Sequence, residues 1–167
     1  IILPLHHLFK RPEAKAAVLS LGMAVFFLAA DMGFLIFAPR LTSKPIAEEI
    51  NRRPTANSSI VIDGEYEEGS SVAFYTGRTV LLHNGRSSNL EYGSRYPDAP
   101  PLFLDDEKLK ALWNGPSGRV FLVTFESKQG KLESLLPQPK LVLANYGDKI
   151  LLSNRSDADQ PGNHARK

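Results

Sequence analysis

The chain has 167 residues, and its 20 basic and 18 acidic side chains leave a formal net charge of only +2. The basic residues are scattered among acidic ones rather than concentrated in one stretch, which excludes a nucleic-acid partner at the level of composition. No cysteine is present, so disulfides, thiolate metal sites and cysteine nucleophiles are excluded as well.

Residues 1–15 combine a short apolar run with a basic, histidine-containing stretch. The run ends at Leu5, and the chain begins with isoleucine rather than methionine. We interpret residues 1–15 as the end of a preceding membrane segment and its loop, with an artificial chain start as the alternative. His6 and His7 are interpreted as residues of the membrane interface rather than metal ligands.

Residues 16–39 are predicted to form a transmembrane helix. At about 1.5 Å rise per residue, these roughly 24 residues span about 36 Å, and a bilayer's hydrocarbon core is about 30 Å thick. A cleaved signal peptide is the alternative, but its apolar region is about 7–15 residues long and is followed by small residues. This run is longer and ends in Pro39-Arg40.

Asp31 is the one charged residue of the predicted span. A carboxylate near the middle of a bilayer costs about 2.5–3.5 kcal/mol on the insertion scale and usually faces other helices or an aqueous cavity. Asp31 is therefore either a polar contact to a substrate path or a hydrogen-bond partner of a neighbouring helix, and we favour the second. Small residues on the same helix, Gly22, Ala29 and Gly33, also favour close helix packing.

Residues 40–154 are predicted to form one small α/β domain. The expected strands are apolar rather than alternating, and helices lie between them, which favours a mostly parallel, Rossmann-like sheet in three layers. A final hairpin would add an antiparallel edge, and residues 155–167 lack large apolar side chains and are predicted to be a disordered tail. The expected strands are 60–62, 79–83, 102–104, 120–125, 141–145 and 150–153; the expected helices begin after Ser43, at Ser70, after Asp105 and at Lys131.

Nucleotide-binding and hydrolase motifs are absent. No G-x-G-x-x-G follows the first strand, where Asp63-Gly64 leads instead into three glutamates that would repel a pyrophosphate. Neither a phosphate-binding G-x-x-x-x-G-K-[ST] nor a G-x-S-x-G nucleophile motif occurs. His83 is interpreted as structural, and the acidic run 65–68 as a solvated loop rather than a divalent-cation site. No metal site is predicted.

The order of segments after the span resembles a known family. SKPIAEEI, SIVIDG, VAFYTGRTVLL, LEYG, YPD and RVFLV follow one another between Ser43 and Val123. This series resembles the C-terminal extracytoplasmic domain of bacterial integral-membrane glycosyltransferases of the GT-C group. That group includes protein O-mannosyltransferase-like enzymes and the aminoarabinose transferase that modifies lipid A. The resemblance covers Ile1 to about Asn154, and AFYTGR and LEYG are its most specific parts.

The resemblance implies a polytopic enzyme of the bacterial inner membrane that transfers a sugar from a polyprenyl-phosphate carrier to a lipid, glycan or protein acceptor. The family's catalytic acidic residue lies in the first extracytoplasmic loop, upstream of Ile1, so no catalytic residue is carried over to this chain. Residues 16–39 would be the C-terminal transmembrane helix, and residues 40–154 an accessory periplasmic domain. The implied partners are the bilayer, upstream helices of the same chain and the polyprenyl-phosphate donor.

Two questions stay open at this point. The segment implies no cofactor, but the sequence does not decide whether the complete enzyme uses a divalent metal. The competing function is a non-enzymatic, membrane-anchored periplasmic binding or sensor domain. The sequence immediately upstream of Ile1 would distinguish the two functions.

Four residues are candidates for contact with substrate: Tyr75, Arg78, Tyr92 and Arg95. They lie in predicted loops or at element ends, where ligand-facing residues of open α/β sheets concentrate. An arginine guanidinium can donate two hydrogen bonds at once to a phosphate or carboxylate. The alternative, which we favour, is that both tyrosines pack the domain and both arginines are ordinary surface charges.

Overall fold

The computed structural model describes residues 12–53, 57–116 and 118–157. The chain divides into two compact units, Ile1–Pro39 and Arg40–Lys167, which are described separately below. Most of the predicted preceding membrane segment and loop, residues 1–11, lies outside the described residues. So does most of the predicted disordered tail, residues 158–167.

The first unit is formed by helix α2, Pro12–Leu41, which continues into the first residues of the second unit. It has 30 residues and no buried residue, and its most apolar window has a mean hydropathy of 2.1. By length and composition it can cross a membrane, as predicted, and it is the one such helix in the described part of the chain. We predicted it as the C-terminal transmembrane helix of a longer protein; within this chain it lies near the N-terminus.

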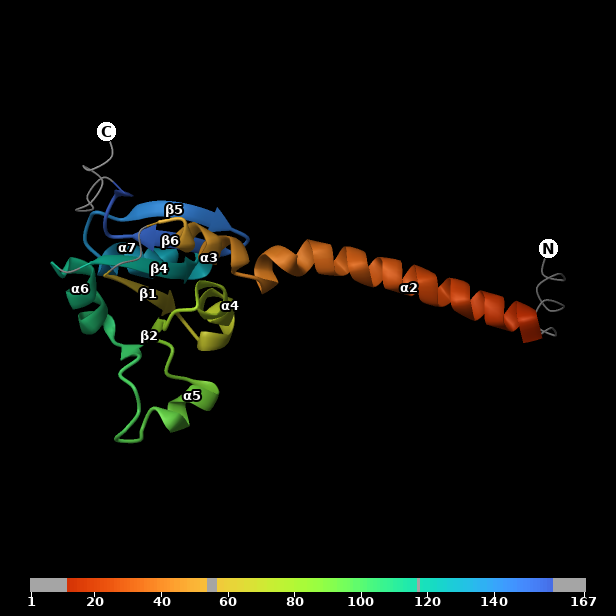
Figure 1. Cartoon of the computed structure of the whole chain (residues 1–167), viewed down its shortest axis with the longest axis horizontal. Coiled ribbons are helices and arrows are strands. Elements are labelled where there is room, and N and C mark those ends of the chain that lie inside the picture. Colours follow the sequence, from red (N-terminus) through yellow and green to blue (C-terminus); the bar gives the residue numbers. More distant parts are fainter. Residues whose placement is uncertain (1–11, 54–56, 117, 158–167) are drawn as a thin grey trace. The chain divides into compact units, whose positions relative to one another are not determined.

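The second unit is built on a six-stranded sheet with the order β3-β2-β1-β4-β6-β5 (Figure 1). The first four strands in this order run parallel, and β6 is antiparallel to both β4 and β5. This arrangement confirms the predicted mostly parallel sheet with an antiparallel hairpin at its edge. The strands are β1 Ser58–Asp63, β2 Leu81–His83, β3 Phe103–Leu104, β4 Arg119–Phe125, β5 Leu141–Tyr146 and β6 Lys149–Ser153.

Helices cover both faces of the sheet, which confirms the three-layer α/β class. Ile60 and Ile62 of β1 pack in one apolar cluster with side chains of α3 and α4. Val61, which points to the other face as strand geometry requires, packs in a second cluster with side chains of α6 and α7. The helices are α3 Lys44–Asn51, α4 Tyr66–Thr76, α5 Ser88–Gly93, α6 Asp106–Asn114 and α7 Gln129–Leu135.

Several element ends follow the sequence signals. Asp105 caps α6, since its Oδ1 accepts a hydrogen bond of 2.8 Å from the Lys108 N–H. Gly77 ends α4 in the left-handed conformation with φ 64°, the position where glycine avoids steric cost. Ser43 occupies the position before α3 but makes no side-chain capping bond, and its own N–H donates to Ser71 Oγ at 2.9 Å.

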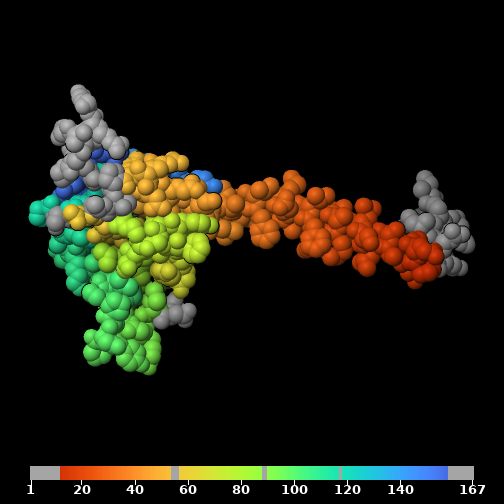
Figure 2. All heavy atoms as spheres, viewed as in Figure 1, coloured from red at the N-terminus to blue at the C-terminus, as the bar shows by residue number. Residues whose placement is uncertain are grey.

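Two local predictions were wrong. Residues 65–68 are not a solvated loop, because α4 begins at Tyr66 rather than at Ser70. The Glu68 carboxylate accepts the Glu65 N–H at 3.2 Å, and acidic side chains are favourable in a first helical turn. No helix was predicted within the turn-rich residues 86–101, but they contain α5. With the chain that follows it, α5 projects from the rest of the unit (Figure 2).

Candidate functional site

The sheet has a topological switch point between β1 and β4. From β1 the chain proceeds to β2 and β3 on one side, whereas β4 pairs with β1 on the other side. In open α/β sheets ligands bind outside the carboxyl ends of the strands at such a point. Asp63 and His83 are the last residues of β1 and β2, so this edge brings together ionisable groups from neighbouring strands.

His83 lies between two carboxylates at this edge. Its Nδ1 is 2.7 Å from Asp63 Oδ1, and its Nε2 is 2.8 Å from Asp106 Oδ1. The His83 side chain is fully buried and that of Asp63 is 6% exposed, whereas that of Asp106 is 43% exposed. The second oxygen of Asp63 accepts a hydrogen bond of 3.1 Å from Thr124 Oγ1. The network thus ties together β1, β2, β4 and the first turn of α6.

The two carboxylates favour the charged form of the imidazole ring. Burial lowers the pKa of His83, but hydrogen bonds to Asp63 and Asp106 outweigh burial and raise its pKa above the ordinary value. The hydrogen bond from His83 in turn lowers the pKa of Asp106. An ionised carboxylate can only accept, so carboxylate contacts at both ring nitrogens suit the doubly protonated, charged form of His83.

A polar crevice of 440 Å³ adjoins this network at the switch point. Lys128 closes one side of it, because its Nζ contacts Glu68 Oε2 at 2.8 Å and the Asp63 carbonyl oxygen at 3.2 Å. Gly64 passes directly beneath this ion pair with φ 137°, and a Cβ there would lie 2.2 Å from Glu68 Oε2. The lining residues are Asp63, Gly64, Glu65, Glu68, Asn84, Ser127, Lys128 and Lys131.

The ionisable groups at this edge of the sheet are engaged in internal contacts, which limits the reactions that they could catalyse. Both nitrogens of His83 are held by carboxylates and its side chain is buried, so the ring cannot act as a general base in this arrangement. The crevice mixes carboxylates with two lysines and does not form a phosphate cradle. Among the described residues, no cluster of three or more histidine, aspartate or glutamate side chains could hold a metal ion. The network of Asp63, His83, Asp106 and Thr124 therefore has a structural role, and we call it the clamp.

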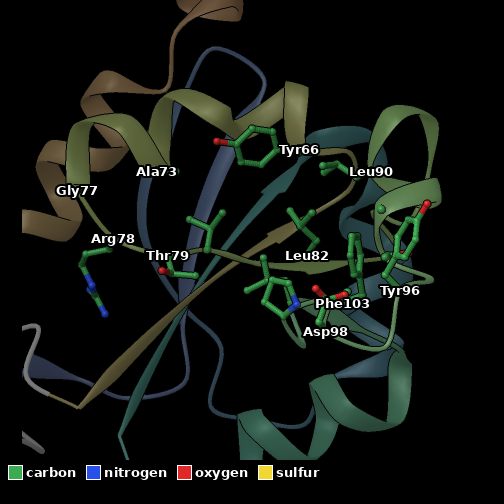
Figure 3. Close-up of a pocket in the computed structure, with 16 residues that line it drawn as sticks. Tyr66, Ala73, Gly77, Arg78, Thr79, Leu82, Leu90, Tyr96, Asp98 and Phe103 are labelled. Carbon is green, nitrogen blue, oxygen red and sulfur yellow. The ribbon is translucent and has the colours of Figure 1, made fainter.

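A second, larger cavity lies beside the sheet between α4, β2 and the projecting α5 segment. We call it the lateral groove; it has a volume of 860 Å³ and a predominantly apolar lining (Figure 3). Tyr66, Leu82, Leu90 and Phe103 are among the side chains that line it. Its composition suits an apolar ligand or a packing partner more than a sugar.

Arg78 is the one predicted site residue that lines the lateral groove. It lies at one end of the groove next to Thr79, whereas Tyr96 and Phe103 lie at the other end (Figure 3). Its Nη2 donates to the Ser58 carbonyl oxygen at the start of β1. Burial lowers the pKa of Arg78. Its guanidinium thus makes a structural contact in this conformation.

The other three predicted site residues are not gathered with Arg78. Tyr75 packs edge-to-face on Phe74, with ring centroids 5.1 Å apart. Tyr92 on α5 is 72% exposed, and its hydroxyl oxygen accepts a hydrogen bond of 2.8 Å from Tyr96, which does line the groove. Arg95 is exposed and pairs with Glu91. Asp31 is exposed on α2, and its role as a membrane contact stays a prediction.

Sequence reasoning missed the network around His83, although part of its signal was present. Asp63 and His83 each end an apolar run, and parallel strands place such ends at one edge. Asp106 and Thr124 carry no comparable signal, because one follows a helix cap and the other lies inside an apolar strand.

Comparisons with known proteins bear on the fold. No family model matches the sequence, and no curated protein gives a significant match. The structure of ArnT from Cupriavidus metallidurans bound to undecaprenyl phosphate matches with a TM-score of 0.64 and 21% identity, over 93% of this chain and 28% of that chain. The structure of the same protein in the apo state matches with a TM-score of 0.62 and 20% identity, over 87% of this chain and 26% of that chain.

These matches show a shared fold and confirm the resemblance at that level. A coverage of 93% is more than the globular unit alone accounts for, so the matched region includes part of α2. The chain corresponds to little more than a quarter of the length of ArnT.

Proposed function

We propose that this chain is the C-terminal segment of a bacterial membrane glycosyltransferase. The complete enzyme would transfer a sugar from a polyprenyl-phosphate carrier to a lipid, glycan or protein acceptor. The observation that carries the proposal is the match to ArnT, which extends over both the apolar helix and the α/β unit. The ArnT structure was obtained with undecaprenyl phosphate, which supports a polyprenyl-phosphate partner.

Within this enzyme, residues 40–154 serve as an accessory domain on the periplasmic side of the inner membrane. The His83 network supports an accessory role, because both ring nitrogens of this buried histidine are occupied by internal contacts. The catalytic acid lies in a part of the enzyme upstream of Ile1. We assign no cofactor to this segment, and the four residues Tyr75, Arg78, Tyr92 and Arg95 remain candidates for substrate proximity.

The competing proposal is a membrane-anchored binding or sensor domain without transferase activity. The lateral groove favours it, since a volume of 860 Å³ with an apolar lining is in the range of small-molecule sites. A sensor would bind a ligand there without any polyprenyl-phosphate substrate.

A transfer assay tests the two proposals. Membranes containing the complete natural protein are given a radiolabelled polyprenyl-phosphate sugar, and the label in lipid, glycan and protein fractions is counted. Membranes containing only residues 1–167 serve as the matched control. We expect transfer with the complete protein and none with the segment. Absence of transfer to every acceptor class, at normal expression, would contradict the transferase.

A further inference from the structure

Two large aromatic side chains lie exposed at the end of helix α4. Phe74 is 78% exposed and Tyr75 is 41% exposed, and we call this pair the α4 aromatic patch. The two rings contact each other edge-to-face with an interplanar angle of 84°. The rest of α4 is polar or faces the core, so the patch is not a continuation of the apolar interior.

The patch lies beside the point where the chain enters the globular unit. The Ser43 N–H donates to Ser71 Oγ at 2.9 Å, and Ser71 is one helical turn before the patch. Lys44 Nζ lies 5.8 Å from the centroid of the Tyr75 ring. Helices α3 and α4 lie side by side in the unit (Figure 1), so these contacts join the first residues after Pro39 to the patch.

The short connection limits how far this surface can lie from a membrane. From Pro39 to Ser43 the extended chain reaches at most about 14 Å, at about 3.5 Å per residue. Pro39 ends the apolar run, and the polar headgroup region adds about 5–7 Å to each side of the hydrocarbon core. Because the Ser43 N–H bonds to Ser71 on α4, the start of the patch is tied to a point of the chain within about 14 Å of the end of the apolar run, a reach that includes the headgroup region.

We propose that the α4 aromatic patch docks the globular unit on the lipid headgroups of the bilayer that α2 crosses. Aromatic side chains concentrate at this level of membranes, where their rings are stabilised between water and hydrocarbon. Lys44 beside the patch adds positive charge that suits anionic lipid headgroups. This inference rests on α2 being a membrane span, as the proposed function requires.

The patch differs from the other exposed aromatic pair of the domain. Tyr92 and Tyr96 are 72% and 51% exposed, and they belong to the projecting α5 segment and the residues just after it. The Tyr92 and Tyr96 rings contact each other, with centroids 5.5 Å apart, and the Tyr96 hydroxyl donates to the Tyr92 hydroxyl oxygen at 2.8 Å. Tyr92 therefore provides a matched control: an exposed aromatic residue on a short helix of the same unit.

The absence of cysteine makes a labelling experiment direct. Three single-cysteine variants of the full chain are prepared, Phe74→Cys, Tyr92→Cys and Phe27→Cys, the last as a reference within α2. Each is labelled with a nitroxide and reconstituted in vesicles of phosphatidylethanolamine and phosphatidylglycerol. Collision rates with oxygen, which concentrates in lipid, and with a water-soluble nickel chelate are measured by electron paramagnetic resonance. All three positions are exposed, so the labels do not disturb the core.

The expected result is an oxygen-to-nickel ratio at position 74 several-fold higher than at position 92 and lower than at position 27. A ratio at position 74 equal to that at position 92 would overturn the docking proposal, because the patch would then be in water. Protection of position 74 from both reagents would overturn it too, since a protein surface would cover the patch. A water-like ratio at position 27 would instead refute the membrane span itself, which separates the two failures.

Discussion

Replacement of His83 by alanine tests whether the clamp at the carboxyl edge stabilises the domain. The substitution leaves Asp63, with a side chain only 6% exposed, as a buried carboxylate without its cation. Breaking a buried ion pair in this way typically costs about 3–5 kcal/mol. Because the Thr124 hydroxyl still donates to Asp63 at 3.1 Å, we expect the lower end, about 3 kcal/mol.

Asp106→Ala is the matched control. The Asp106 side chain is 43% exposed, so solvent screens its pairing with His83 and the loss is about 0.2–1 kcal/mol. Without Asp106 the ring can become neutral, keeping its bond to Asp63 while the Asn84 amide, 3.2 Å from Nε2, donates to the free nitrogen. The two variants therefore separate the buried half of the clamp from its exposed half.

The clamp also predicts how stability depends on pH. The pKa of His83 is raised in the folded state, so its contribution is complete below the unfolded value of about 6.5 and is lost as pH rises through the folded pKa. The lowered pKa of Asp106 matters at acidic pH: the stability that Asp106 contributes is lost as pH falls through its folded-state pKa. In the natural chain the urea concentration at the unfolding midpoint should therefore decrease as pH rises above about 6.5, and this decrease should be absent in His83→Ala.

Urea unfolding in detergent micelles measures these effects. Trp113 is the one tryptophan of the chain and is 3% exposed on α6, so its fluorescence reports loss of the globular unit. Equal losses in His83→Ala and Asp106→Ala would refute the argument. So would a pH slope above about 6.5 that persists unchanged in His83→Ala.

Three further predictions follow from the geometry. Gly64→Ala should destabilise the domain by about 1–3 kcal/mol, because the φ of Gly64 is 137° and an added Cβ would meet Glu68 and Lys128. Gly130→Ala is the control: this position on helix α7 has open space, so the substitution should be neutral or stabilise the domain by up to about 1 kcal/mol, and equal urea midpoints for the two variants would contradict the prediction. Arg78→Ala should lower the urea midpoint, because it removes the hydrogen bond to the Ser58 carbonyl oxygen, whereas Arg95→Ala at an exposed position should leave the midpoint unchanged. If Arg95→Ala instead reduces sugar transfer by the complete enzyme at normal stability, Arg95 belongs to the substrate path. Fusions after Asn154 should be active with a periplasmic phosphatase and dark with a cytoplasmic fluorescent protein, and the reverse pattern would refute the proposed orientation.

The strand and helix order of the globular unit could be predicted because its apolar runs are short, clearly bounded and separated by caps such as Asp105 and Gly77. The start of α4 could not, because glutamates at positions 65–68 resemble a solvated loop until Glu68 is seen to bond the Glu65 N–H. For the site, strand ends at Asp63 and His83 are visible in the sequence. Their partners Asp106 and Thr124 could not be predicted, because tertiary packing rather than the local sequence brings α6 and β4 beside these strand ends.

The last strand of the domain is also an interior one, which has a consequence for how the protein is made. β6 lies between β4 and β5 and pairs with both, and the buried Lys149 at its start donates to the Arg40 carbonyl oxygen at 2.6 Å. Synthesis proceeds at about 5–20 residues per second, so β4 is complete for seconds before β6 emerges. During that interval one edge of β4 lacks its pairing strand. The domain therefore completes its sheet only after β6 has been synthesised, and a ribosome that stops before residue 149 leaves β4 with an open, aggregation-prone edge.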